Sequence, residues 1–194
     1  MLIVGLGNPG EEYEKTRHNA GRIVLEYIAK AQDFSDWKVD MKTKSLRSKG
    51  EIEKEKFDFL LPETFMNNSG NAVAYIIDDK KKLKNLIVVY DDIDLPIGSL
   101  KISFNRSSGG HNGVQSIIKK VKSQEFVRIR IGVSPHTPTG KLKKPSGEDK
   151  ILKFLLGEFK DDELKELKKM SKKVAEIITM ISSDGHPKAM SLFN

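Results

Sequence analysis

Short apolar runs alternate along this chain with segments whose apolar residues recur at helical spacing, and this alternation restricts the fold more than any other feature. Leu2–Leu6 and Leu86–Tyr90 have the continuous apolar character of buried strands. Between them, Asn19–Gln32 repeats its apolar residues every three or four positions, as one face of a helix does. We therefore predict an α/β fold, in which helices cover both faces of a sheet.

Further strands and helices follow from the same patterns. We predict strands within residues 42–61 and at Ser99–Phe104 and Val127–Val133, a turn at Asp94–Gly98, helices at Asn68–Asp79, Gly113–Val121, Asp149–Gly157 and Asp161–Ser182, and a short tail segment at Gly185–Asn194. The length of 194 residues fits one domain, so we predict a single domain over residues 1–194.

One stretch differs from the rest in composition. Residues 134–148 combine three prolines and two glycines with Lys141, Lys143 and Lys144. Proline and glycine interrupt helices and strands, and too little chain follows for an independent core. We predict a mobile, basic loop here rather than a linker between two domains.

Composition excludes several classes of protein. The chain has no cysteine, which excludes disulfide scaffolds, thiol nucleophiles and cysteine-based zinc sites. The absence of cysteine also fits a reducing cytoplasm, and no apolar run approaches the ~18 residues of a membrane span. We therefore expect a cytoplasmic protein without a membrane segment. The net charge of +7 suggests an anionic partner, although many lysine-rich proteins are merely well solvated.

A glycine pattern near the start of the chain suggests one alternative function. Gly5–Gly10 matches the G-x-G-x-x-G pattern of dinucleotide-binding loops and follows a predicted strand. Such a site needs a helix that begins at the last glycine, under the pyrophosphate. Here Glu11 and its acidic neighbours lie where phosphates would bind, and the helical pattern starts only near Ala20. A nucleotide-dependent oxidoreductase is the weaker interpretation, and a tight loop that presents Asn8 at the sheet edge is the better one.

Polar residues gather at four places where strands end or helices begin. These are Thr16–Asn19, Phe65–Gly70, Asp91–Asp94 and Gly109–Gly113. In an open α/β sheet, ligands collect at the carboxyl ends of the strands. Hydrolysis by an activated water requires a histidine base, an aspartate that orients it and amides that donate to the oxyanion. No Gly-x-Ser-x-Gly elbow is present, so a covalent acyl-enzyme has no obvious carrier.

Each of these signals is weak when taken alone, because a single histidine is more often structural and an aspartate run is often a turn or a cap. Metal binding is poorly supported as well. The four histidines are His18, His111, His136 and His186, and no two of them are close enough in sequence to form a metal-binding motif. With no cysteine to add a ligand, we predict no metal site.

In these segments the sequence resembles bacterial-type peptidyl-tRNA hydrolases. The blocks that carry the resemblance are Leu2–Tyr13, Thr16–Gly21, Pro62–Gly70, Tyr90–Gly98, Gly109–Gly113 and Arg128–Gly132. They keep the family's order and near-family spacing over residues 1–134. The fit loosens afterwards, although Ile151–Phe159 still resembles the segment that follows the family's lid.

The resemblance implies an enzyme that cleaves the ester between a peptide and the 3′-terminal ribose of tRNA, and so recycles tRNA from stalled translation. It also implies a monomeric domain around a mixed sheet, with no metal and no cofactor. The basic loop of residues 134–148 would be the family's lid. An activated ester needs neither a covalent nucleophile nor a metal, because water and a good base suffice.

Carried over position by position, the resemblance makes His18 the general base and Asp91 its partner. Asn8 would help to distinguish N-blocked peptidyl esters from free aminoacyl esters. Met66 would line the cleft, and His111 would belong to a flexible wall near the tRNA end. The positions that match substrate-contacting residues are Tyr13, Phe65, Asn67 and Asn112. Either of the last two asparagines could donate to the oxyanion.

The net positive charge is concentrated in about a quarter of the chain, because acids are nearly absent there. Residues 100–145 hold ten lysines and arginines and one acid, so this segment carries +9 and the remainder −2. We predict a phosphate-contacting face beside the cleft, with Lys101, Arg106 and Arg130 as contacts. A non-catalytic RNA-binding protein would use the same face, and it would need the basic residues but not His18.

Overall fold

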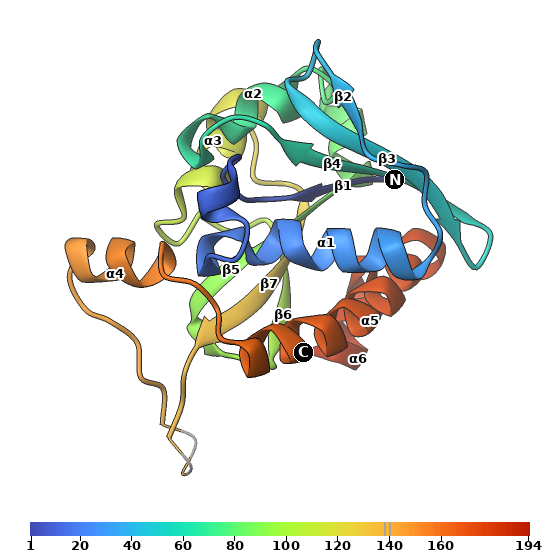
Figure 1. Ribbon diagram of the computed structural model, residues 1–194. Helices are drawn as coiled ribbons and strands as arrows, with labels where there is room; N and C mark the ends of the chain where they lie inside the picture. The colour runs from blue at the N-terminus through green and yellow to red at the C-terminus, as the bar shows by residue number, and fades with distance from the viewer. Residues whose placement is uncertain (138, 140) are drawn as a thin grey trace.

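A seven-stranded sheet forms the centre of the computed structural model, which describes residues 1–137, 139 and 141–194 (Figure 1). Its strands are β1 (Leu2–Gly5), β2 (Lys38–Asp40), β3 (Ser45–Ile52), β4 (Glu55–Pro62), β5 (Leu86–Pro96), β6 (Leu100–Phe104) and β7 (Val127–Ser134). They follow the order β2-β3-β4-β1-β5-β7-β6. The four strands β4, β1, β5 and β7 are parallel, whereas the β2–β3, β3–β4 and β6–β7 pairs are antiparallel. The predicted mixed sheet is confirmed.

Helices lie on both faces of this sheet, as predicted (Figure 1). They are α1 (Ala20–Ala31), α2 (Ser69–Ala74), α3 (Asn112–Val121), α4 (Glu148–Leu155), α5 (Asp161–Asp184) and α6 (His186–Phe193). Four short 3-10 helices are η1 (Glu11–Tyr13), η2 (Arg17–Asn19), η3 (Met66–Asn68) and η4 (Lys80–Asn85). The pair α1 and α5 covers one face, and the pair α2 and α3 covers the other.

The core has two layers because the central strands are apolar on both sides. All four residues of β1 are buried. Ile3 packs into the cluster formed with α1 and α5, whereas Leu2 and Val4 pack into the cluster formed with α2 and α3. A parallel strand with helices on both faces must be apolar at successive positions, which is why these segments are continuous hydrophobic runs.

The carboxyl ends of the parallel strands meet at one edge of the sheet, and α1 begins close to that edge. Gly21, near the start of α1, lies against β5: a Cβ added there would be 2.1 Å from the carbonyl oxygen of Val89. Because Gly21 lacks a side chain, the helix can approach the strand this closely. The segment just before α1 is thereby brought next to the end of β5.

Strand β5 is longer than predicted, and the predicted turn at Asp94–Gly98 is wrong in its first half. β5 continues to Pro96, since β7 keeps pairing with it across a register shift between Asp92 and Pro96. The Ser134 hydroxyl also donates a hydrogen bond to the carbonyl oxygen of Ile93. Asp91 therefore lies within a strand rather than at its end, and it is paired there with Ile131 of β7.

The helix predicted at Asn68–Asp79 is wrong in its second half. Helix α2 ends at Ala74, because the amides of Ile76 and Ile77 both donate to the carbonyl of Val73 and tighten the chain into a turn. Ile77 then enters the core, so the apolar run that suggested a longer helix is explained by a buried turn.

The predicted tail segment is helix α6. Gly185, at a φ of 86°, ends α5, and α6 starts directly after it with a proline in its first turn. The side-chain amide of Asn194 accepts a hydrogen bond from the Ile102 amide and donates one to the Ile102 carbonyl, at 2.7 and 3.0 Å. This contact covers part of the free edge of β6, which would otherwise present unpaired backbone groups.

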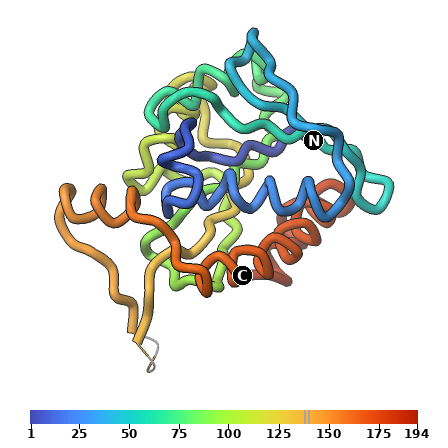
Figure 2. The backbone as a smooth tube through the Cα atoms, in the orientation of Figure 1, coloured from blue at the N-terminus to red at the C-terminus, as the bar shows by residue number. Residues whose placement is uncertain are grey.

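The predicted lid leaves the sheet after β7, extends away from it and returns through α4 (Figure 2). Pro138 and Gly140 of this loop lie outside the described residues. On either side of them, His136 and Leu142 form an isolated antiparallel bridge. The mobility of this loop stays a prediction.

Candidate active site

His18 and Asp91 meet at the edge of the sheet where β5 passes the start of α1. The predicted approach is confirmed, since His18 Nδ1 lies 2.9 Å from Asp91 Oδ1 across 73 residues of sequence. Both side chains are buried, with 8% and 1% of their surfaces exposed. His18 belongs to η2, and the close packing of α1 against β5 sets its distance from the carboxylate.

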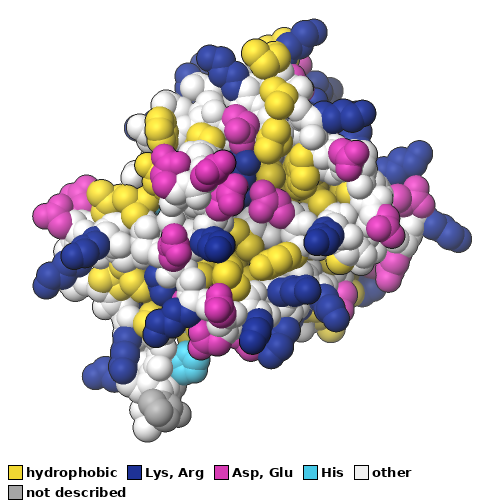
Figure 3. All heavy atoms as spheres, viewed as in Figure 1, with side chains coloured by type: hydrophobic (Ala, Val, Ile, Leu, Met, Phe, Trp, Pro, Cys, Tyr) yellow, Lys and Arg dark blue, Asp and Glu magenta, His cyan; other side chains and the backbone are white. Residues whose placement is uncertain are grey.

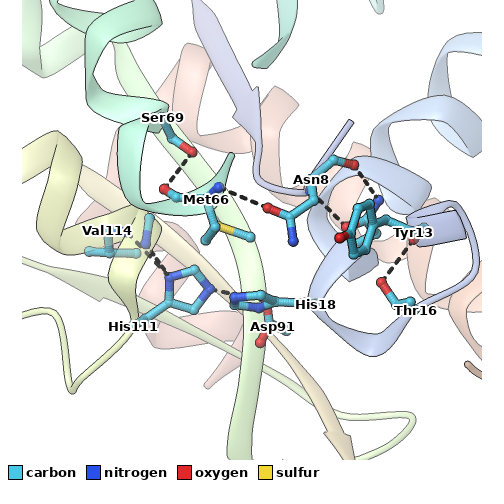
Figure 4. A network of polar contacts seen from close by, with 11 residues as sticks. Asn8, Tyr13, Thr16, His18, Met66, Ser69, Asp91, His111 and Val114 are labelled. Carbon is cyan, nitrogen blue, oxygen red and sulfur yellow. Dashed lines mark hydrogen bonds and ion pairs between the residues drawn. The ribbon is translucent and has the colours of Figure 1, made fainter. Parts of the chain in front are cut away.

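His111 contacts the same carboxylate, which the sequence did not suggest. Its Nε2 lies 3.0 Å from Asp91 Oδ1 (Figure 4). Its Nδ1 accepts hydrogen bonds from the amides of Gly113 and Val114, at 3.1 and 3.3 Å, and thereby caps α3. An acceptor at Nδ1 places the proton on Nε2, so the cap fixes the tautomer that donates to Asp91. This side chain is therefore held at both ring nitrogens, and the flexibility of the wall around it stays a prediction.

The hydrogen bonds define how the cluster is protonated. Asp91 Oδ1 accepts from both imidazoles, so His18 donates through Nδ1 and keeps its Nε2 lone pair free. Burial by itself would lower the pKa of His18, but the charge of Asp91 and its hydrogen bond outweigh burial and raise it above the ordinary 6.5. Burial would likewise raise the pKa of Asp91, but the two histidines hold it well below its usual range. The carboxylate stays ionised, and His18 can take a proton from a neighbouring molecule.

The same three residues are the one group among the described residues that has metal-ligand geometry, with ligand atoms all within 4.8 Å of one another. The hydrogen bonds argue against a bound ion. His111 uses one lone pair to cap α3 and carries a proton on its other nitrogen, so a metal at Nε2 would require an imidazolate. That the protein binds no metal stays a prediction, and the hydrogen bonds of His111 give a chemical reason for it.

Asn8 is held in one orientation beside the histidine. Its Oδ1 accepts from the Met66 amide at 2.8 Å, which assigns the other amide atom as the Nδ2 donor. Asn19 fixes the backbone at the same position: its Oδ1 accepts from the Asn8 amide at 2.8 Å, and its Nδ2 donates to the Asn8 carbonyl at 2.9 Å. Figure 4 shows Nδ2 of Asn8 directed toward the space beside His18.

The other predicted substrate contacts differ in exposure. Tyr13 and Phe65 form an edge-to-face pair with ring centroids 6.4 Å apart, and Phe65 is 58% exposed. Asn67 and Asn112 are exposed, and their side chains make no hydrogen bond to any described residue. Met66 instead packs in the core under the site, where its backbone amide, rather than its side chain, holds Asn8.

A cavity of about 640 Å³ opens beside the two histidines, and its walls include Asp91 and His111. All three predicted phosphate contacts line it, namely Lys101, Arg106 and Arg130. Arg130 is paired with Asp92, and Lys144 of the predicted lid is paired with Asp94. The cavity is therefore rich in cations, two of which already contact carboxylates. Figure 3 shows a different face, where acidic side chains gather over η1 and α1.

Arg128 is the largest fully buried side chain among the described residues, whereas the sequence pattern distinguished it in no way from the other basic residues of 100–145. Its Nη1 donates to the carbonyl of Ser107 at 2.7 Å, and its Nη2 donates to the carbonyl of Arg106. It thus holds the loop that leads to His111. The role of Asn19 in holding the Asn8 backbone was also not predicted. The one sequence feature that could have indicated it is its position next to His18 in a polar segment.

The glycine pattern does not form a phosphate site. Gly10 lies at a φ of 112° and leads into the three-residue η1, whose first turn is acidic. Helix α1 begins only at Ala20, and its start is already bonded to this loop, because the Arg22 amide donates to the carbonyl of Leu6 at 3.1 Å and Asn19 Oδ1 accepts from the Asn8 amide. None of the described helices combines the length and the hydropathy required to span a membrane.

Comparisons with known proteins agree with this geometry. A family model described as peptidyl-tRNA hydrolase matches residues 2–194. A peptidyl-tRNA hydrolase of Caldanaerobacter subterraneus is 41% identical over 194 residues, which cover all of this chain and 98% of that protein. One of Clostridium acetobutylicum is 39% identical and is covered to 97%. The crystal structure of peptidyl-tRNA hydrolase from Acinetobacter baumannii superposes with a TM-score of 0.86 at 29% identity, covering all of this chain and 93% of that one.

Proposed function

This chain belongs to the peptidyl-tRNA hydrolase family and is therefore a hydrolase of peptidyl-tRNA, and we propose that it uses His18 to activate the attacking water. The observation that carries this proposal is the buried His18–Asp91 pair, at 2.9 Å, with Nε2 of the imidazole left without a proton. Peptidyl-tRNA is the substrate.

The reaction needs only water and this base. Nε2 of His18 removes a proton from water as the water oxygen attacks the ester carbonyl carbon. Asp91 stabilises the imidazolium that results, because its negatively charged carboxylate lies against the opposite ring nitrogen, Nδ1. The carbon–oxygen bond to the 3′-terminal ribose then breaks, and the imidazolium returns the proton to the departing ribose oxygen. The products are the free peptide acid and tRNA.

Asn8 selects for esters whose amino group is blocked. Its Nδ2 is a fixed donor, because Oδ1 is committed to the Met66 amide. A peptidyl ester offers a peptide carbonyl to this donor. A free aminoacyl ester offers an ammonium group, which can only donate, so the same amide nitrogen has no acceptor to bind.

The oxyanion that forms during attack is stabilised by an asparagine amide from Asn67 or Asn112. Both are exposed, Asn67 within η3 and Asn112 at the start of α3, and neither side chain is hydrogen-bonded to a described residue, so both can bind a substrate. Tyr13 and Phe65 provide an aromatic surface for the peptide next to Asn8. A lost oxyanion donor costs roughly 10²- to 10³-fold in rate, which a comparison of the two alanine variants would assign.

The tRNA lies along the basic cavity. Lys101, Arg106 and Arg130 line it together with Asp91, so phosphates bound there would hold the 3′ end of the acceptor arm next to the base. The affinity is expected to fall steeply with salt, because phosphate contacts release counterions. The enzyme is proposed to act as a monomer in the cytoplasm, and light scattering after size-exclusion chromatography measures the first point.

The direct test is release of the N-blocked amino acid from N-acetyl-aminoacyl-tRNA and from the unblocked ester. We expect the wild type to cleave the blocked ester far faster, and His18→Ala to lose roughly 10²- to 10⁴-fold in rate. Equal rates for wild type and His18→Ala would reject His18 as the base. Binding of tRNA without release by either protein would favour the non-catalytic RNA-binding alternative.

A further inference from the structure

We infer that Arg17 is a positioning residue that fixes helix α4 to the chain segment carrying His18, and so sets one wall of the tRNA cavity. The inference deepens the proposed function and rests on it. Arg17 precedes His18 directly, yet its side chain reaches the junction between α4 and α5 rather than Asp91. The two neighbours therefore serve different parts of the same site.

Helix α4 needs such an anchor because none of its residues is fully buried, and only Phe154 and Leu155, at its C-terminal end, pack partly against the core. Helices in proteins are held mainly by packing of an apolar face, and an eight-residue helix is marginal without it. Ile151 and Leu155 of α4 nevertheless line the cavity that contains Asp91 and His111. The position of this wall is set by whatever holds the C-terminal end of α4.

The backbone provides the first part of the anchor. The Arg17 amide donates to the carbonyl of Gly157 at 3.0 Å, and the Phe159 amide donates to the carbonyl of Lys15 at 2.8 Å. Thr16 and Glu158 form an isolated antiparallel bridge between these two bonds. The segment before His18 and the segment after α4 are thus paired like two short strands.

The guanidinium provides the second part. Nη1 donates to the carbonyl of Glu158 at 2.7 Å, and Nη2 contacts Glu163 Oε2 at 2.9 Å. The guanidinium carbon lies 4.8 Å from the ring centre of Phe154 in α4 and 5.5 Å from that of Phe159. Arginine suits this place because it can donate in two directions and stack on an aromatic ring at once, which a lysine ammonium cannot do.

Glu163 links the anchor to α5. Its Oε2 also accepts from the Lys160 amide at 2.8 Å, which is part of the capping box at the start of α5. A single carboxylate thus caps α5 and holds the side chain that holds α4. Glu163 and Arg17 are each 12% exposed, so solvent screens their pairing only in part.

The test compares two glutamates of the same helix. Glu163→Gln retains an oxygen that can cap α5 but removes the negative charge that pairs with Arg17. Glu166→Gln is the control, because it removes the same charge from an exposed pair with Lys169. With N-acetyl-aminoacyl-tRNA as substrate, we expect Glu163→Gln and Arg17→Lys to raise KM roughly tenfold, as expected for a lost charge-assisted hydrogen bond. We expect kcat to stay within about twofold of wild type and the pH dependence of kcat to be unchanged. The double variant should have the same KM as the single variant with the higher KM, because both changes break the same contact.

Hydrogen exchange at residues 148–158 separates positioning from a general loss of stability. We expect faster exchange there in Glu163→Gln and Arg17→Lys, with unchanged exchange in β5. Equal KM values for the Glu163→Gln and Glu166→Gln variants would overturn the inference while leaving the proposed function intact. A fall in kcat with a displaced pH limb would also overturn it, because Arg17 would then act on His18 itself. No hydrolysis by the wild type would instead reject the proposed function.

Discussion

The catalytic cluster and the basic cavity lie side by side, but they are built in opposite ways. In the cluster, His18, Asp91 and His111 have side chains at most 8% exposed, and Asp91 Oδ1 accepts from both rings. In the cavity, Lys101 and Arg106 are exposed on a strand and a loop. Packing of α1 and α3 around β5 fixes the geometry of the cluster. The cavity is defined mainly by its positive charge, and its exposed side chains are held less tightly.

This difference follows from what each region must do. Proton transfer requires a base within hydrogen-bond reach of its target and in one tautomer, so burial and paired ring nitrogens are needed. Phosphates are attracted over longer distances and by any arrangement of cations, so exposed side chains suffice. We therefore expect changes in the cluster to act on kcat and its pH dependence, and changes in the cavity to act on KM and its salt dependence.

Replacement of the carboxylate should give the largest separation between the two regions. For Asp91→Asn we expect kcat to fall roughly 10²- to 10⁴-fold, since the carboxylate orients His18 and stabilises its imidazolium. Without that charge, burial lowers the pKa of His18, so the acid limb of the residual activity should move to lower pH than in wild type. A pH–rate profile measures both effects, and an unmoved limb would contradict the role given to Asp91.

Neutralising the cavity should raise KM roughly 10- to 100-fold and leave kcat nearly unchanged. The triple variant Lys101→Met, Arg106→Met, Arg130→Met removes up to three phosphate contacts, so the slope of log KM against log salt should fall by about two to three units. The control is Lys119→Met, Lys120→Met, Lys122→Met, which removes the same charge from positions outside this cavity. If both variants behave alike, net charge rather than the cavity governs binding.

A change at His111 should reduce kcat about tenfold without unfolding the protein. Asparagine is a good helix cap, so His111→Asn can still accept from the amides at the start of α3 while losing the bond to Asp91. His111→Ala should lose the same rate and also about 1 kcal/mol of stability with the cap. Thermal unfolding and kcat of the two variants, measured together, distinguish the roles; equal stability would reject the cap.

The smallest expected effect is a gain in binding. Asp92→Asn removes the carboxylate paired with Arg130 but retains an oxygen for the Asp94 amide. Arg130 should then be more available to phosphate, and KM at low salt should fall about two- to threefold. An unchanged or higher KM would mean that Asp92 is needed to hold Arg130 in place.

The sequence was sufficient to predict the α/β class and the two helix layers, because these depend on local hydrophobic patterns. Polar segments that follow parallel strands predicted where a site would lie, but the pairing of His18 with Asp91 came from the resemblance to the family. It was not sufficient for the contact between His111 and Asp91, because the Nδ1 cap that fixes His111 depends on how α3 begins. The end of α2 was missed for a similar reason, since Ile76 and Ile77 have the same apolar character in a helix as in a buried turn.

Buried polar residues were the hardest to assign from sequence. Arg128 and Arg130 are two positions apart on β7 and both border the cavity, yet Arg128 is buried and binds backbone carbonyls, whereas Arg130 is partly exposed and pairs with Asp92. Both count equally in the net charge of the basic segment, residues 100–145. Only the loop that leads to His111, which lies across β7, distinguishes them.

The most direct test of the account is the pH dependence of kcat/KM for wild type and His18→Ala with N-acetyl-aminoacyl-tRNA. His18 must be neutral to accept a proton, and Asp91 raises its pKa above the ordinary 6.5, so activity should rise with pH through a midpoint above 6.5. His18→Ala should lose both that limb and most of the rate. A wild-type rate that is flat between about pH 5 and 8, or a limb that persists in His18→Ala, would contradict the account.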